Sequence, residues 1–260
     1  MTLTPVQRAG WDDDCWIVCR RALRAETVEQ LRRDVADLRR WADDDGPGLH
    51  HFEQTDHGPA LARSERFADE HAGLGGFLRS GPIVEVVGQL FGEPAVLFKE
   101  KVNYKAPGGA GFAPHQDATA YRFADHHISV MVPLDPATVD SGCLWFAPGH
   151  GEGRLPTDAG NRIDEGTVAR LRWRPVEVEP GDVVYFDSYA PHRSDANTTD
   201  RSRTALYLTY NAESVGDLRE RYYRDKQAEL ATAGGTFDGA RVRISVNDDF
   251  LGRPVEGPDS

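Results

Sequence analysis

The stretch Ala113-Pro-His-Gln-Asp117 places a histidine and a carboxylate two residues apart, in a segment that we expect to end a β-strand. Alternate side chains of a strand leave the same face. His115 and Asp117 should therefore converge on one point, as two neighbouring ligands of a metal would. A further histidine, His192, lies much later in Tyr189-Ala-Pro-His-Arg-Ser194, also at an expected strand end.

Two histidines and one carboxylate form the facial triad of non-haem Fe(II) oxygenases. A His-x-Asp triplet is weak evidence by itself, because such triplets arise by chance in many proteins. The similar context of His192 strengthens the case. On these residues alone, a purely structural role for all three stays open.

The bulk composition describes an ordinary globular protein. The 260 residues are 39% hydrophobic and 28% charged, which permits a sizeable core. The net charge of −12 argues against nucleic acid or an anionic membrane as the main partner. Three cysteines without paired spacing are typical of a reducing compartment. With no signal-peptide pattern and no long apolar run, we expect a cytoplasmic protein.

Helices are expected in five segments, the first a short one opened by Thr4-Pro5. Apolar residues recur at three- and four-residue spacing over 25–43, and shorter helices are expected over 67–78, 82–91 and 219–230. The segment 46–58 is expected to be a loop, with histidines at positions 50, 51 and 57. We do not favour a metal site there, because no carboxylate stands at strand or helix spacing to complete it.

Short strands bounded by turn residues fill the rest of the chain. They are expected over 94–105, 128–134, 142–147, 176–178, 182–186 and 202–210, with a brief piece at 242–246. The polar segment 151–173 is an insertion of the kind that forms a lid or wall over a site. We therefore predict one domain, 1–260: a helical N-terminal third, a jelly-roll core over about 94–213, and a C-terminal helix and tail. The fold class is mainly β with flanking helices.

One strand of this core carries unusual polar residues. Lys99, Lys101 and Asn103 alternate in the segment 94–105 and so share one face. This face is either the solvated side of an edge strand or the wall of a polar cavity that accepts anions.

An iron bound by three protein ligands keeps three positions open, two for a bidentate co-substrate such as 2-oxoglutarate and one for O2. The distal carboxylate of 2-oxoglutarate then needs a buried cation, for which the planar fork of arginine is suited. Arg203 is a candidate if a hairpin returns it beside His192, and Ser194 could add a hydroxyl. The alternative is a surface arginine in a basic patch with Arg201.

Several motifs in their order resemble the phytanoyl-CoA dioxygenase family, over roughly Leu90 to Asp225. They are Phe98-Lys-Glu-Lys-Val-Asn-Tyr-Lys105, the turn Pro107 to Gly111, Pro114-His-Gln-Asp117, Asp140-Ser-Gly-Cys-Leu144, Pro148-Gly-His150, and Pro180-Gly-Asp-Val-Val-Tyr-Phe-Asp187 running into Pro191-His-Arg-Ser194. The resemblance implies a double-stranded β-helix core of the cupin-like jelly-roll type. It also implies Fe(II), 2-oxoglutarate and O2, and hydroxylation of a small molecule.

Carried over by position, the resemblance implies that His115, Asp117 and His192 bind iron. It implies that Arg203, assisted by Ser194, holds the distal carboxylate of 2-oxoglutarate, and that Lys99 and Asn103 contact the co-substrate. Related halogenases have a small residue in place of the carboxylate. The presence of Asp117 therefore favours hydroxylation.

The substrate is less well defined. The segments 98–105 and 207–226 look most like the bacterial small-molecule branch that includes aminoethylphosphonate-type hydroxylases. Lys101 could pair with a phosphonate or carboxylate. Four residues near the metal motif are candidates for the substrate side, each with a structural role as the alternative: Gln116, Thr119, Tyr121 and His127. A natural-product intermediate or another small amine or acid is an equal possibility.

Two other classes of function remain open at this point. One is a metal-binding jelly-roll protein without oxygenase activity. The other is a hydrolase or isomerase on a cupin-like barrel. Arg203 and Ser194 argue against the first, because a structural metal site needs no distal arginine. We expect a monomer or a homodimer.

Overall fold

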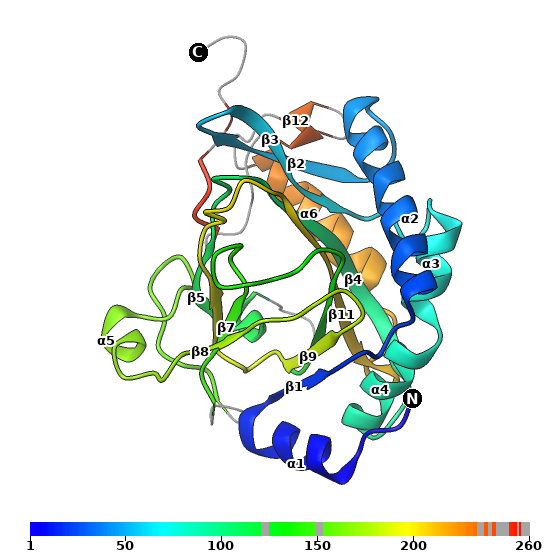
Figure 1. Ribbon diagram of the computed structural model, residues 1–260, viewed down its shortest axis with the longest axis vertical. Coiled ribbons are helices and arrows are strands. Elements are labelled where there is room, and N and C mark those ends of the chain that lie inside the picture. The colour runs from blue at the N-terminus through cyan, green and yellow to red at the C-terminus, as the bar shows by residue number, and fades with distance from the viewer. Residues whose placement is uncertain are drawn as a thin grey trace.

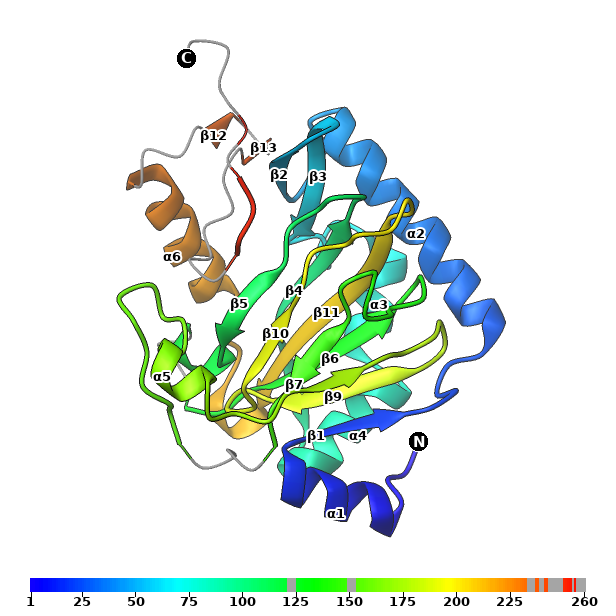
Figure 2. The same cartoon turned by 60° about the vertical axis from the view of Figure 1, so that its left-hand side comes forward.

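The computed structural model describes residues 1–120, 125–148, 153–232, 237–238, 241–242, 250–253 and 255. Within these residues, two β-sheets pack face to face, and helices cover the outer face of the larger sheet (Figures 1 and 2). This mainly β architecture with flanking helices is the predicted jelly-roll class.

The larger sheet contains nine strands among the described residues. Their order is β1 (Trp16–Cys19), β9 (Val183–Asp187), β6 (Ile128–Pro133), β11 (Arg203–Ala212), β4 (Ala95–Lys105), β3 (Gly58–Glu65), β2 (Leu49–Thr55), β13 (Arg241–Val242) and β12 (Phe237–Asp238). All neighbours are antiparallel except β13 and β2. The smaller sheet has the order β5 (Phe112–His115), β10 (His192–Ser194), β7 (Leu144–Phe146) and β8 (Arg174–Val176).

The helices are α1 (Pro5–Asp14), α2 (Ala25–Asp43), α3 (Ala72–Arg79), α4 (Pro82–Phe91), α5 (Glu165–Val168) and α6 (Arg219–Thr232), with 3-10 turns η1 (Asp117–Thr119) and η2 (Glu213–Val215). The apolar stripe of α2, which includes Val28, Leu31, Val35 and Leu38, is fully buried. Burying such side chains stabilises the fold by about 1.5–3 kcal/mol each. Both predicted boundaries of α4 are confirmed, with Pro82 in its first turn and Gly92 as a left-handed C-cap.

Strand β4 explains how one sheet serves both a core and a polar site. Val102 and Tyr104 face outward, into the hydrophobic core under the helices. Lys99, Lys101 and Asn103 face the opposite way, toward the smaller sheet. Because β4 pairs with β11 on one side and β3 on the other, it is a central strand. The alternative of a solvated edge strand is therefore wrong.

Glu100, on the outward face of β4, anchors two distant segments. Its buried carboxylate accepts hydrogen bonds of 2.8 Å from the backbone nitrogens of Phe67 and Ala68. It also pairs with Arg219 at the start of α6. A buried carboxylate without such partners would be costly, so Glu100 fixes α6 against the sheet.

The loop predicted over 46–58 does not form. The segment instead contains β2 and the start of β3. Its register with β3 includes His50 opposite Ser64, and the two side chains hydrogen-bond at 2.9 Å. The polar composition gave a turn signal, but long-range pairing of β3 with β4 stabilises these strands. The helix expected over 67–78 is also shorter, because His71 caps α3 through the backbone nitrogen of Leu74.

The insertion 151–173 has little regular structure, as predicted, apart from α5. Its described part packs against the end of β5, where the Ile163 nitrogen donates to the Pro114 carbonyl at 2.8 Å. Residues 149–152 lie outside the described residues, as do 243–246 of the predicted strand piece. None of the described helices is long and apolar enough to cross a membrane.

Candidate metal and co-substrate site

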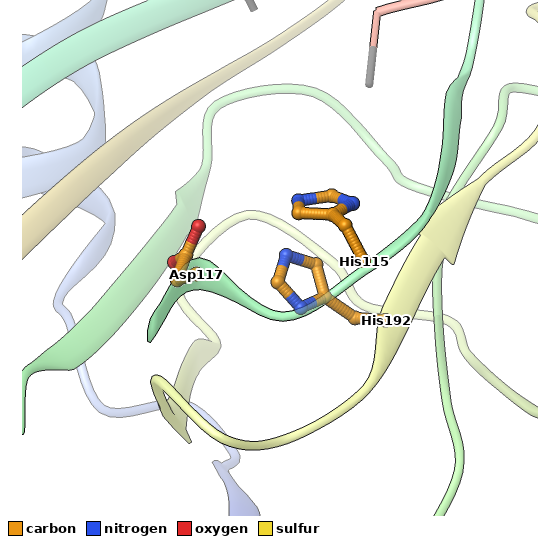
Figure 3. A group of neighbouring side chains, drawn as sticks. All are labelled: His115, Asp117 and His192. Carbon is orange, nitrogen blue, oxygen red and sulfur yellow. The ribbon is translucent and has the colours of Figure 1, made fainter. Parts of the chain in front are cut away.

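His115 and His192 lie directly opposite each other on the antiparallel strands β5 and β10 of the smaller sheet. Their ring centroids are 4.1 Å apart. Asp117 points toward the same place from the first residue of η1 (Figure 3). One ligand atom from each of the three lies within 4.8 Å of the others. The structure therefore brings together the three residues that the sequence singled out as metal ligands.

The geometric reason for this convergence differs from the prediction. Strand β5 ends at His115, and Asp117 is already the first residue of the 3-10 turn η1. The carboxylate therefore reaches the histidines through the turn rather than by strict strand alternation.

Hydrogen bonds orient all three side chains. Nδ1 of His115 lies 2.7 Å from the Ala113 carbonyl oxygen, and Nδ1 of His192 lies 3.0 Å from that of Ala190. A carbonyl only accepts, so these contacts place a proton on Nδ1 and make Nε2 the nitrogen suited to a metal. The Ser129 hydroxyl donates to Oδ2 of Asp117 at 2.7 Å.

The electrostatic environment keeps Asp117 ionised. Burial on its own would raise the pKa of this carboxyl, but the charges of His192, Lys99 and Lys101 together hold it far below its usual range. The site thus offers one carboxylate and two imidazole nitrogens, the donor set that Fe(II) oxygenases use. The residues present fit the metal.

Arg203 is buried on β11 of the larger sheet, with 1% of its surface exposed. Its Nη2 donates to the Gly142 carbonyl at 2.7 Å, and its Nη1 to the Tyr207 hydroxyl at 3.3 Å. Its Nε is buried without a hydrogen-bond partner among the described residues. An unsatisfied buried N–H of an arginine suits a carboxylate ligand.

The predicted hairpin between His192 and Arg203 does not form. β10, with His192 and Ser194, belongs to the smaller sheet, and β11 belongs to the larger one. The chain crosses between the sheets instead. Ser194 and Arg203 therefore lie on different sheets, and both are buried.

Lys105 was not predicted as a site residue, although it continues the alternation of Lys99, Lys101 and Asn103. It lies opposite Arg203 in the register of β4 and β11. Its Nζ donates to Ser194 Oγ at 3.0 Å and to the Gly142 carbonyl at 3.3 Å. Lys105 therefore joins the two residues assigned to the co-substrate.

A pocket opens onto the triad between the two sheets. Besides the triad, its described lining residues are Lys101, Asn103, Phe112, Ser129, Leu144, Phe186, Arg193, Ser194, Tyr207 and Thr209. Its volume is about 30 Å³, room for one or two water molecules.

Two predicted residues, Lys99 and Lys101, flank the triad. The Lys101 ammonium lies in the pocket wall, 5.4 Å from the ring centroid of Tyr207 and 5.8 Å from that of Phe112. Lys99 is buried near Asp117, and burial lowers its pKa to about 8 even though the Asp117 charge raises it. Asn103 accepts a hydrogen bond of 3.2 Å from Arg63 and lines the pocket.

The residues proposed for the substrate side differ in their surroundings. The Gln116 amide is bonded to the backbone of Gly153, Leu155 and Tyr189, which accounts for its polar atoms structurally. The Thr119 hydroxyl donates to the Gln116 carbonyl at 2.8 Å. His127 is buried against Phe98, with a pKa lowered to about 4 chiefly by burial. Tyr121 lies outside the described residues.

Known proteins match the chain over nearly its whole length. Residues 11–205 match the family model of phytanoyl-CoA dioxygenase. The methylphosphonate hydroxylase of Gimesia maris is 43% identical over 256 residues, 98% of each chain. The 2-aminoethylphosphonate dioxygenase of the uncultured bacterium HF130_AEPn_1 is 38% identical over 258 residues, 97% of this chain and 98% of that protein.

Solved structures support the fold. EctD from S. alaskensis, solved with 2-oxoglutarate and 5-hydroxyectoine, superimposes with a TM-score of 0.72 at 23% identity, covering 82% of this chain and 77% of that one. The epimerase SnoN, in complex with Fe3+, alpha ketoglutarate and nogalamycin RO, gives 0.68 at 20% identity, covering 97% and 95%.

These matches agree with the donor set of the triad and with the motifs that the sequence carries. They favour an enzyme over the alternative of a metal-binding jelly-roll protein without oxygenase activity. The chain belongs to the phytanoyl-CoA dioxygenase family and is an Fe(II)- and 2-oxoglutarate-dependent dioxygenase.

Proposed function

We propose that His115, Asp117 and His192 hold the Fe(II) of this dioxygenase. The observation that carries the proposal is the meeting of three ligand atoms within 4.8 Å, one from each residue. The backbone carbonyls that fix both imidazoles and the Ser129 hydroxyl on Asp117 preorganise the ligands. Preorganised ligands lose little entropy when the metal binds.

The same proposal assigns the distal carboxylate of 2-oxoglutarate to Arg203 and Ser194. The buried Nε of Arg203 supplies a charged donor, and Ser194 supplies a hydroxyl on the wall of the triad pocket. Lys99 and Asn103 are proposed as further contacts of the co-substrate. When bound, iron and 2-oxoglutarate would activate O2 for C–H hydroxylation: one oxygen atom would enter the substrate and the other succinate, with CO2 released from 2-oxoglutarate.

We propose a small alkylphosphonate as the substrate, with methylphosphonate first and 2-aminoethylphosphonate second. Two relatives that match nearly the full length of this chain are named for these compounds, at 43% and 38% identity. Methylphosphonate has one carbon, so hydroxylation yields hydroxymethylphosphonate.

Lys101 is the residue that we assign to the anionic group of the substrate. It lines the triad pocket, and its charge is felt by the Asp117 carboxyl. An ammonium that faces a pocket attracts a phosphonate by charge and by up to three N–H donors. Gln116, Thr119, Tyr121 and His127 stay as proposed neighbours of the substrate.

Succinate release tests this proposal. Iron-loaded enzyme should release succinate from 2-oxoglutarate faster when methylphosphonate or 2-aminoethylphosphonate is added. It should not respond to acetate or 3-aminopropanoate, the matching carboxylates. Lys101→Met should raise the KM for the phosphonate about 100-fold and leave that for 2-oxoglutarate within about threefold. A wild-type enzyme that ignores both phosphonates would contradict the substrate assignment.

The remaining proposals concern the whole protein. We propose a single domain that works in the cytoplasm as a monomer or homodimer, without nucleic acid or membrane as a partner. The net charge of −12 supports the last point. One sheet that contains strands from both ends of the chain supports the single domain. Light scattering of the purified protein, with and without DNA or vesicles, checks the assembly and the absence of these partners.

A further inference from the structure

Lys105 is a buried cation at the far end of β4, with 4% of its surface exposed. Its Nζ lies 3.0 Å from Ser194 Oγ, 2.5 Å from the Asp195 carbonyl oxygen and 3.3 Å from that of Gly142. Arg203 donates to the same Gly142 carbonyl at 2.7 Å. Two cations and one serine are therefore tied together at one point between the sheets.

The charge of Lys105 sets the direction of its hydrogen bond to Ser194. Burial and the charge of Arg203 lower the pKa of Lys105 well below its ordinary value, but a carboxylate bound beside it would favour the ammonium form. An ammonium group has three N–H donors and no acceptor, so Ser194 Oγ must be the acceptor. A serine hydroxyl that accepts still carries its own proton, which must then point away from the ammonium. Ser194 also lines the triad pocket. Its proton is thereby available to an acceptor in that pocket.

We propose that Lys105 is a positioning residue for the co-substrate. By donating to Ser194 Oγ, it directs the Ser194 hydroxyl proton toward the distal carboxylate that Arg203 binds. This inference rests on the proposed assignment of Arg203 and Ser194 to that carboxylate. It adds a residue that acts on the co-substrate only through another side chain.

The hydrogen bonds at this point predict the consequence for selectivity. A distal carboxylate can accept the proton of the Ser194 hydroxyl, whereas the alkyl end of a 2-oxo acid cannot. The arrangement should therefore favour 2-oxo acids with a distal carboxylate over those without one.

Calorimetric titration without oxygen tests the inference on the iron-loaded enzyme. The two ligands are 2-oxoglutarate and 2-oxopentanoate, which has the same chain length but lacks the distal carboxylate. Selectivity is the Kd of 2-oxopentanoate divided by the Kd of 2-oxoglutarate. Lys105→Met should lower this ratio about 30-fold, while the Kd of 2-oxopentanoate changes less than about threefold. Lys105→Arg keeps a charged donor and should restore most of the ratio.

A double-mutant cycle with Ser194→Ala shows whether Lys105 acts through the serine. In the Ser194→Ala background, Lys105→Met should lower the ratio less than about threefold, because the hydroxyl that it orients is gone. Effects that multiply in the double variant would overturn the inference. So would a Lys105→Met enzyme with the wild-type ratio.

Two further variants separate the possible failures. Arg39→Met removes a cation from the opposite face of β4, where its guanidinium lies 4.2 Å from the Tyr104 ring centroid, and should leave the ratio unchanged. If Arg203→Ala also leaves the ratio unchanged, the proposed co-substrate site fails and the inference with it. If Arg203→Ala collapses the ratio but Lys105→Met does not, only the inference fails. Should Lys105→Met not fold, Lys105→Leu takes its place, with the same expected loss.

Discussion

Arg203 and Lys105 stand directly opposite each other on β11 and β4, and both donate hydrogen bonds to the carbonyl oxygen of Gly142. Three segments far apart in the sequence thus meet at one buried point. We place the distal carboxylate of 2-oxoglutarate at this meeting point.

Replacing Arg203 by alanine should raise the Kd of 2-oxoglutarate about 100-fold, because it removes one partner of a buried, charge-assisted pair. Iron binding should not change, since Arg203 belongs to the other sheet from the two histidines. Calorimetry with 2-oxoglutarate measures the first effect, and metal analysis the second. An unchanged Kd would show that Arg203 has another role.

Replacing Gly142 by alanine should lower the free energy of unfolding by at least about 2 kcal/mol. Gly142 has a φ of +73°, and a Cβ there would lie 2.3 Å from the Asp195 carbonyl oxygen and 2.7 Å from Lys105 Nζ. The variant should also bind 2-oxoglutarate more weakly, because Lys105 must move.

The matched control is Gly92→Ala. Gly92 has a similar φ of +80°, but a Cβ there meets no atom within 4 Å. It therefore costs only the backbone strain, about 1 kcal/mol. Denaturant unfolding of both variants separates strain from the steric clash. Equal losses would mean that the Gly142 site relaxes without cost.

Replacing Asp117 by alanine should abolish stoichiometric Fe(II) binding, since only two imidazoles remain. Ser129→Ala provides a graded comparison, because it removes only the 2.7 Å hydrogen bond to Asp117. Loss of such a supporting contact should weaken metal affinity about 10-fold. Metal analysis after anaerobic loading and dialysis measures both. One tightly bound iron in Asp117→Ala would rule out this carboxylate as a ligand.

Asp182 should make the stability depend on pH in the acid range. Burial raises the pKa of this carboxyl, but hydrogen bonds from the backbone nitrogens of Arg21 and Glu179 and from the Arg20 side chain lower it below its ordinary value overall. A group with a depressed folded-state pKa stabilises the protein above its unfolded value of about 3.9. This contribution is lost as the pH falls through the folded-state pKa.

Asp182→Asn should therefore cost about 1–2 kcal/mol at pH 7 and progressively less below pH 4. Urea unfolding at several pH values measures the difference from the wild type. Asp12→Asn, on an exposed residue of α1, makes the same change of charge and should cost less than about 0.5 kcal/mol. A constant difference across the acid range would contradict the role of the ionised carboxylate.

The sequence predicted much of the site because its chemistry is local. His115 and Asp117 are neighbours, and the motifs around His192 and Arg203 have a recognisable order. The path of the chain that brings Arg203 to the site could not be predicted from local sequence. It depends on β10 and β11 belonging to different sheets, which no local pattern encodes.

In the fold, too, elements with local signals were predicted and elements that depend on long-range pairing were not. Helices α2 and α4 were predicted well, because their signals are local. The apolar periodicity of α2 and the terminal residues Pro82 and Gly92 of α4 can be recognised from neighbouring residues in the sequence. The hairpin of β2 and β3 was missed, because its polar residues become strands only by pairing with β4. Lys105 was overlooked for a related reason, since its partner Ser194 is on β10 of the other sheet and its partner Gly142 is in the loop before β7.

Turnover of methylphosphonate under 18O2 tests most directly whether the enzyme hydroxylates this phosphonate. We expect equal amounts of succinate and hydroxymethylphosphonate, with one 18O atom in the new hydroxyl group and one in succinate. Phosphorus NMR and mass spectrometry of the products measure this. Succinate formed without any hydroxylated phosphonate, or a product without 18O, would contradict it.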